Sequence, residues 1–342
     1  MILRADTYLG IPFDEEIFVN RWGAEPDPVL TALLESGAVV DSAELTANLQ
    51  GAGLQYTIPF LKDIDSTDPQ VNDGKTDITT SEIEGDTQSG SAYKRMKAWT
   101  ARDFINDVQG ADPMGHIIGR VAKYWNKYRQ RQIIALLNGV FGITGDTELS
   151  QHTYNVATTG SSVTDANKIG ATTLNDAITK ALGDHKNSFA MAVMHSDVAK
   201  TLENLQLLEF RKYTDQRGIT STLSIADYNG KLVVVDDGMP VADSASATGT
   251  KEYTTYLLGT GSILMGKGNQ SYPVEAMREP TKNGGQETLI TRVTEALHPN
   301  GFSFEPTTKK LIYNDTELFD SASWKRKMPH KTIPMAKLIT NG

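Results

Sequence analysis

Residues 112–142, "DPMGHIIGRVAKYWNKYRQRQIIALLNGVFG", predict one long helix, and this helix decides the fold. Asp112 can cap its start, Pro113 suits the first turn, and Gly142 can end it. The helix would cover 113–141, which is about 42 Å at the rise of an α-helix. Because this is long for a helix in a globular protein, we expect it to be a structural spine.

The predicted helix has two distinct sides. Residues at intervals of three or four place an apolar and aromatic face on one side and a stripe of cations beside it. Its last turns, Ile133 to Leu137, are apolar almost all round, so we expect that end to be buried within protein. The face comprises Ile117, Val121, Tyr124, Trp125, Tyr128 and Gln132, and the stripe comprises Arg120, Lys123, Lys127 and Arg131.

The cationic stripe allows three interpretations. Regularly spaced cations can contact nucleic acid phosphates by displacing counterions, but most charge runs on helices are solvated or ion-paired. The aromatic residues that could stack on bases lie on the other face, where packing in a core accounts for them. We therefore expect the stripe to be ion-paired, within the chain or with a partner, or to contact nucleic acid phosphates without reading sequence.

The composition is that of a folded globular protein. The chain has 342 residues and a formal net charge of −9, with 39% hydrophobic and 22% charged residues. It has no cysteine, which excludes disulfides and thiolate metal sites. The negative charge argues against a surface that binds polyanions on all sides, so any nucleic-acid contact must be local.

The sequence predicts no contact with a membrane. The N-terminus lacks the apolar core of a secretory signal, and no run approaches the roughly 18 apolar residues that span a bilayer. We expect a protein that stays in the solvent where it is made.

The N-terminal third reads as an extended arm followed by a β-ribbon. Residues 1–47 offer one short helix at about 27–37, and 54–62 predict a strand whose proline favours a sheet edge. Residues 63–77 have the composition of a projecting tip, and β-prone runs follow at 76–84 and 92–100. A two-stranded ribbon is only marginally stable alone, so it needs a partner surface.

The remainder alternates helices and strands, which makes the chain α+β. Residues 143–170 predict a long loop, 171–183 a helix that Gly183 stops, and 188–194 a buried strand, after which Ser196 would cap another helix. A turn at Asn229-Gly230 predicts a hairpin. Further strands are predicted at 253–259, 262–266, 272–278, 287–296 and 302–305.

One stretch resembles a nucleotide-binding loop but lacks an essential part of it. "GSILMGKG", 261–268, fits the phosphate-loop pattern as far as Lys267, yet Gly268 stands where a hydroxyl should hold magnesium. The following residues predict a strand, whereas a phosphate loop opens a helix. We expect turns and strands here, and no cofactor.

The histidines and acidic residues form no catalytic pattern either. The six histidines show no metal-ligand spacing, and His195 with Asp197 at a strand-to-helix junction is typical of local capping. Asp236 and Asp237, like Glu82 and Glu84, are compatible with turns and strand edges. The sequence therefore predicts a protein that is not an enzyme.

The order of these parts resembles the major capsid proteins of tailed double-stranded DNA bacteriophages with the Hong Kong 97-type fold. The resemblance covers nearly the whole chain and includes three stretches that look like the family's axial domain. These are "AMAVMHSDVAKTLENLQLLEF" (190–210), "YNGKLVVVDDGMP" (228–240) and "TYLLGTGSILMGKG" (255–268).

The resemblance implies a map of the chain. It comprises an N-terminal arm at 1–47, an extended β-ribbon called the E-loop at 48–99, a peripheral domain at 100–189 with spine helix 113–141 and loop 143–170, an axial domain at 190–285, and a return to the peripheral domain at 286–342.

The resemblance also implies partners and a location for the protein. Copies would form the hexamers and pentamers of an icosahedral head, located in the virion and assembled in the cytoplasm of a bacterial host. Because the arm begins almost at Met1, a separate scaffolding protein is expected, along with a portal, non-specific contact with packaged DNA and a possible decoration protein. Candidate inter-subunit contacts in the ribbon are Asp65, Asp68, Asp73 and Lys75.

Two alternatives remain. Encapsulins, the shells of bacterial cargo compartments, have the same fold but are usually shorter and begin with a helix. The other alternative is a nucleic-acid-binding protein that uses the basic helix 113–141.

Overall fold

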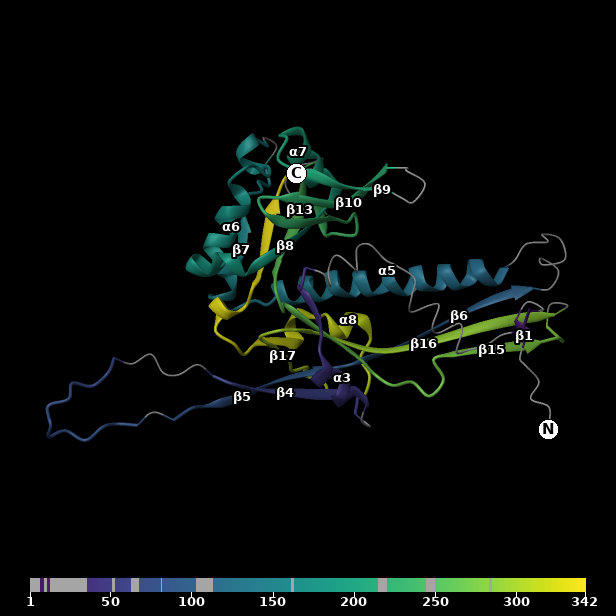
Figure 1. Ribbon diagram of the computed structural model, residues 1–342, viewed down its shortest axis with the longest axis horizontal. Coiled ribbons are helices and arrows are strands. Elements are labelled where there is room, and N and C mark those ends of the chain that lie inside the picture. Colours follow the sequence, from purple (N-terminus) through teal and green to yellow (C-terminus); the bar gives the residue numbers. More distant parts are fainter. Residues whose placement is uncertain are drawn as a thin grey trace.

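A computed structural model describes residues 7–8, 11–12, 36–50, 53–62, 68–80, 82–102, 113–160, 163–214, 220–243, 250–282 and 285–342. Figure 1 shows three parts: an elongated body, a lobe above one end of the body's long helix, and a ribbon that projects beyond the body.

The body consists of one long helix on a sheet of long strands. Helix α5, Pro113–Phe141, has the predicted bounds. It lies along β16, Gln286–Pro299, which pairs antiparallel with β6, Tyr93–Arg102, on one edge. On its other edge β16 pairs with β15, Val274–Glu279, and with β14, Ile263–Lys267. A contiguous core joins α5 to this sheet through Val121, Trp125, Val274, Leu289 and Val293.

The N-terminal segment lies against the same sheet. Strand β3, Val39–Asp41, pairs in parallel with β14, and α3, Ala43–Gln50, packs beside it. The packing is close, because a Cβ at Gly266 would lie 2.6 Å from Leu45. The hairpin of β1, Thr7–Tyr8, and β2, Ile11–Pro12, lies near β15. The predicted helix at 27–37 lies outside the described residues up to residue 35.

The lobe is an eight-stranded sheet with helices beside it. Its strand order is β7-β19-β13-β8-β11-β10-β9, with β12 paired to β13. Helices α6, Thr173–Leu182, and α7, Ser196–Asn204, bury their apolar sides in the core of the lobe. The strands are β7 Thr153–Asn155, β8 Phe189–Met194, β9 Glu209–Thr214, β10 Thr220–Tyr228, β11 Lys231–Val235, β12 Val241–Asp243, β13 Lys251–Gly259 and β19 Met335–Thr340.

Local predictions in the lobe are confirmed with one exception. Asn229 and Gly230 have φ of 51° and 73°, as the predicted hairpin turn between β10 and β11 requires. The prediction that Ser196 caps α7 is wrong. His195 is the N-cap, because its Nδ1 accepts a hydrogen bond from the Asp197 amide at 3.1 Å.

The ribbon consists of β4, Gln55–Leu61, and β5, Gly85–Ser91. The predicted run at 76–84 is not a strand in the described residues 76–80 and 82–84, because no strand of the part of the chain that the structure describes pairs with it. The run at 92–100 forms β6, but it leaves the ribbon and pairs with β16. The sheet therefore gains a long edge strand that local sequence had assigned to the ribbon.

Short elements complete the chain. The predicted loop 143–170 contains only 3₁₀ helices and β7 as regular structure in its described part. The remaining elements are η1 Leu149–His152, η2 Asp165–Asn167, η3 Gly183–Ser188, β17 Phe302–Phe304, α8 Asp315–Leu318, η4 Ser321–Ser323, β18 Trp324–Arg326 and η5 His330–Thr332.

The sheets cross the predicted domain boundaries. β7 and β19 lie outside 190–285 yet belong to the lobe, whereas β14 and β15 lie inside that range and pair with β16. The physical reason is that hydrogen bonding joins strands that lie far apart in the sequence. A division of the chain into consecutive segments therefore does not coincide with the sheets.

Candidate assembly surfaces

The side of α5 that faces the sheet has the predicted character. Trp125 is 2% exposed, and its indole N–H donates to Thr291 Oγ1 at 3.1 Å. Tyr124 packs edge-on between Trp99 and Trp125, at 5.3 Å from each ring. The aromatic residues therefore join the helix to the sheet and are not available to stack on bases.

A buried ion pair lies within this junction. Arg129 Nε donates to both carboxylate oxygens of Glu295 at 2.9 Å, and Glu295 is 4% exposed. Tyr93 Oη donates to the same carboxylate at 3.0 Å, while Arg129 Nη1 donates to Asn126 Oδ1 at 2.8 Å. Burial, followed by the Glu295 charge, raises the pKa of Tyr93 well above its usual value, so the phenol remains a donor.

This pair is not among the residues predicted from the sequence, although the sequence contains a signal for Arg129. Arg129 lies four residues after Trp125, so the two share a side of the helix. A cation on that side needs a buried anion.

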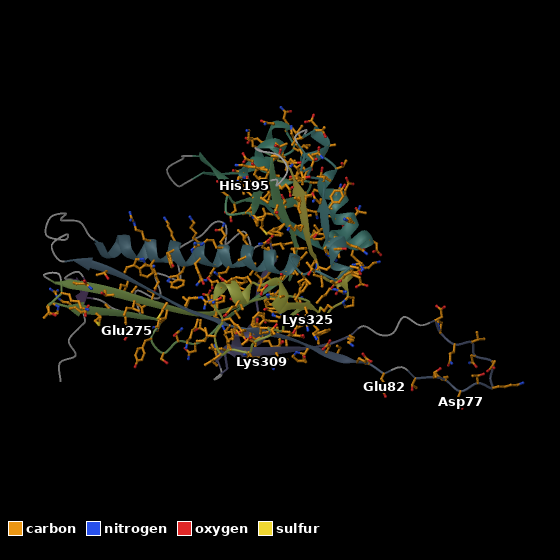
Figure 2. The ribbon with its side chains drawn as sticks, turned by 180° about the vertical axis from the view of Figure 1, so that it is seen from behind. Asp77, Glu82, His195, Glu275, Lys309 and Lys325 are labelled. Carbon is orange, nitrogen blue, oxygen red and sulfur yellow. The ribbon has the colours of Figure 1, made fainter. Side chains whose placement is uncertain are left out.

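The basic stripe is exposed, and the described residues leave it uncompensated. Arg120, Lys123, Lys127 and Arg131 are all exposed, and no carboxylate of the described residues lies within 4 Å of any of them. Arg131 also approaches an aromatic ring, since its Cζ lies 5.9 Å from the centre of the Tyr128 ring. Side chains ending in nitrogen stand on the side of α5 away from the sheet (Figure 2). Within the described residues the stripe makes no ion pair, and pairing between subunits and contact with packaged DNA stay predictions.

The root of the ribbon is fixed to the body by a buried polar chain. Tyr56 of β4 contacts His298 Nδ1 at 3.2 Å, and His298 Nε2 contacts Gln88 Oε1 of β5 at 3.0 Å. The Gly301 amide donates to the same Gln88 oxygen at 2.9 Å. Burial lowers the pKa of His298 to about 3, so the ring is neutral. At Gly90 a Cβ would lie 2.3 Å from the Tyr56 ring, so glycine allows the two strands and the ring to pack.

Beyond its root, the described part of the ribbon projects away from the body. Residues 68–80 and 82–84 are exposed and have no regular structure, and Figure 2 shows Asp77 and Glu82 far from the body. Asp73 closes a turn by accepting from the amides of Lys75 and Thr76 at 2.9 and 2.7 Å. These hydrogen bonds lower the pKa of Asp73 to about 2.

The predicted inter-subunit contact residues of the ribbon therefore lie where a second subunit could reach them, and their role as contacts stays a prediction. Asp68, Asp73 and Lys75 are exposed in the tip, and Asp65 lies outside the described residues.

The ribbon carries most of the chain's excess charge together with exposed apolar residues. Residues 63–86 contain eight acidic residues and one lysine, so they contribute −7 of the net −9. The apolar side chains are 64% to 86% exposed. The acidic residues are Asp63, Asp65, Asp68, Asp73, Asp77, Glu82, Glu84 and Asp86, and the apolar ones are Leu61, Val71, Ile78 and Ile83.

The motifs that suggested chemistry have structural roles. His195 caps α7 by accepting a hydrogen bond from the Asp197 amide, so this pair has the local capping role that the sequence predicted. The near-match to a phosphate loop forms a turn and β14, and Lys267 lies 3.7 Å from Asp41. Within the described residues, no group of three or more metal-ligating side chains could hold an ion.

Comparison with known proteins identifies the family. Residues 135–333 match the model of the family described as Gp13-like, major capsid protein 13-like. The chain belongs to this family of phage major capsid proteins. It is also 32% identical over 307 residues to the major capsid protein of Bacillus phage SPP1, covering 89% of each chain.

The fold agrees with this assignment. The capsid subunit superposes on the capsid of Ralstonia phage GP4 with a TM-score of 0.58 and 10% identity, covering 90% of this chain and 88% of that one. For the capsid of Helicobacter pylori bacteriophage KHP30 the TM-score is 0.52 at 12% identity, with 93% and 92% covered. The fold is thus the Hong Kong 97-type α+β fold of phage capsids, as the sequence predicted.

The family assignment decides between the interpretations raised by the sequence. The subunit is a structural component of a phage virion, a major capsid protein of a tailed-phage head, and not an encapsulin or a sequence reader. No helix among the described residues has the length and apolarity to cross a membrane.

Proposed function

We propose that copies of this subunit form hexamers and pentamers of an icosahedral head around double-stranded DNA, with the ribbon of each copy lying on a neighbouring copy. The observation that carries this proposal is the ribbon itself. Its root is fixed to the body by Tyr56, Gln88 and His298, whereas the described residues of its outer part, 68–80 and 82–84, are exposed throughout. An isolated two-stranded ribbon is marginal in water, so a neighbour must supply the surface that orders it.

The proposed shell needs many contacts, each of modest strength. A ribbon that holds its subunit in a ring of copies turns each further contact into an intramolecular one, and the affinities combine by effective concentration. In this proposal, residues 1–47 are the arm, 48–99 the E-loop, 100–189 and 286–342 the peripheral domain, and 190–285 the axial domain. Strand β19 pairs with β13 of the axial domain and with β7, and β14 and β15 pair with β16 of the peripheral domain.

The basic stripe suggests a further contact. Four exposed cations with no carboxylate within 4 Å in the described residues suit the phosphates of packaged DNA, which can be bound without reading sequence. A separate scaffolding protein, a portal and a decoration protein belong to the same proposal, as does assembly in the cytoplasm of a bacterial host. The proposed role is structural and involves no catalysis.

Deleting residues 68–80 tests the proposal. The deletion removes only exposed residues, so the subunit should keep its circular dichroism spectrum and melting temperature. It should nevertheless form no closed shells under conditions in which the wild type forms them, as seen by negative-stain microscopy. Shells indistinguishable from the wild type would show that the ribbon has no role in assembly.

A further inference from the structure

The loop between β17 and α8 displays two adjacent aliphatic side chains to solvent. Leu311 is 74% exposed and Ile312 is 45% exposed, and both follow the exposed Lys309 and Lys310. Exposed residues that stand singly are ordinary on protein surfaces, whereas exposed apolar residues that cluster mark interaction sites. These two contribute little to their own core.

The loop is nevertheless held in one conformation. The Lys310 amide donates to Tyr313 Oη at 2.9 Å, and Gln55 Nε2 donates to the Lys310 carbonyl at 3.1 Å. Arg95 Nη2 donates to the Tyr313 carbonyl at 3.0 Å, and Tyr313 is buried. A loop fixed at both ends in this way presents Leu311 to a partner at little further cost in conformational entropy.

The surface around the loop is basic. Lys310 pairs with Glu317, and Lys325 and Lys327 both pair with Glu305 at 2.9 and 3.0 Å. Lys309 has no carboxylate within 4 Å among the described residues. These four lysines outnumber the two glutamates they pair with, and Asp86 of the same chain also attracts Lys327, so Lys309 is the cation of this group that the described carboxylates leave uncompensated.

The ribbon tip complements the loop 305–313 in charge and in apolar character. The formal charge of −7 on residues 63–86 makes packing of two ribbons on each other unfavourable and favours a cationic surface as the partner. It also exposes Val71, Ile78 and Ile83, which an apolar partner could cover.

The two surfaces of one chain lie far apart. Figure 2 shows Lys309 at the lower margin of the body, with Asp77 and Glu82 well beyond it on the projecting ribbon. The ribbon that covers this loop must therefore come from another copy. Because Lys309 lies at the margin of the body, a second subunit placed beside this margin could contact it.

We propose that the loop 305–313 of one subunit receives the ribbon tip of a second subunit, with Leu311 and Ile312 against the apolar residues of the ribbon and Lys309 facing its carboxylates. This inference rests on the proposed function and adds to it the surface on which the ribbon docks.

Cysteine-specific cross-linking tests the contact, because the chain contains no cysteine. Subunits carrying V71C, I78C or I83C are co-assembled with subunits carrying L311C and treated with a short bis-maleimide. A matched receiver carries M96C, since Met96 is 78% exposed on β6 and lies outside the loop. Juxtaposed thiols have an effective concentration in the millimolar range, so at least one ribbon variant should cross-link to L311C about tenfold more than to M96C.

The outcomes separate the inference from the proposed function. Cross-linking to M96C in preference to L311C, or to neither, overturns the docking site even where shells form. Normal shells from the 68–80 deletion instead overturn the ribbon's role in assembly.

A double variant, L311S/I312S, gives an independent test. Because both side chains are exposed, it should melt like the wild type and yet yield about tenfold fewer shells, by loss of apolar contact area at each interface. Shell yields equal to those of the wild type would overturn the proposal.

Discussion

The two sides of α5 differ in whether their charges are compensated. On the side facing the sheet, Arg129 is bound by the buried Glu295 of the same chain. On the opposite side, the cations of the stripe are exposed and have no carboxylate within 4 Å in the described residues. The first side stabilises the fold and the second is available to partners. The comparison teaches that stability and assembly can be altered separately in this subunit.

The largest effect on stability is expected from Glu295→Ala. Removing one partner of a buried ion pair leaves Arg129 as an uncompensated charge and should lower the free energy of unfolding by about 3–5 kcal/mol. Urea unfolding measures this change. The matched control is Glu275→Ala, which breaks the partly exposed pair with Arg292 and should cost less than about 1 kcal/mol. Equal losses for the two variants would contradict the contrast between buried and exposed pairs.

The root of the ribbon gives a smaller, pH-dependent effect through His298. Its pKa is about 3 in the folded protein and 6.5 when exposed, so the unfolded chain binds a proton that the folded chain excludes. The stabilisation is complete above pH 6.5 and is lost progressively as the pH falls towards the folded value. Between pH 7 and pH 5 the loss from this residue should be about 2 kcal/mol.

Urea unfolding of the wild type and of His298→Gln, at pH 7 and at pH 5, isolates this contribution. Glutamine cannot titrate, so the wild type should lose about 2 kcal/mol more than the variant over this interval. Parallel losses in the two proteins would show that His298 is not held neutral by burial.

Much of α5 and of the lobe could be predicted because the signals are local. Pro113 and Gly142 mark the ends of the helix, and Asn229-Gly230 specifies a hairpin whatever surrounds it. The pairing of β6 with β16 joins residues nearly two hundred positions apart, as in Thr100 with Thr288. No local sequence pattern specifies a pairing partner at this distance. Because β6 directly follows the ribbon in the sequence, its residues were predicted to be part of the ribbon.

The candidate sites divide in the same way. Helical spacing was enough to place the stripe on one exposed side, because a helix fixes which residues share a face. The sequence did not indicate that Leu311 and Ile312 are exposed, because two adjacent apolar residues show no periodicity that would assign them to a core or to a loop. Only the structure shows that they are exposed.

The smallest effect on stability is expected from neutralising the stripe by replacing Arg120, Lys123, Lys127 and Arg131 with glutamine. Their removal breaks no ion pair of the described residues and relieves repulsion between cations four positions apart, so the free energy of unfolding should stay level or rise by less than about 1 kcal/mol. If the stripe contacts DNA phosphates, filled heads of the variant should release DNA at a lower temperature than wild-type heads, while empty heads of both should be equally stable. Tight, salt-sensitive binding of duplex DNA by the free wild-type subunit in fluorescence anisotropy would contradict a contact that depends on the assembled shell, because a stripe of four cations alone supplies only weak, non-specific affinity.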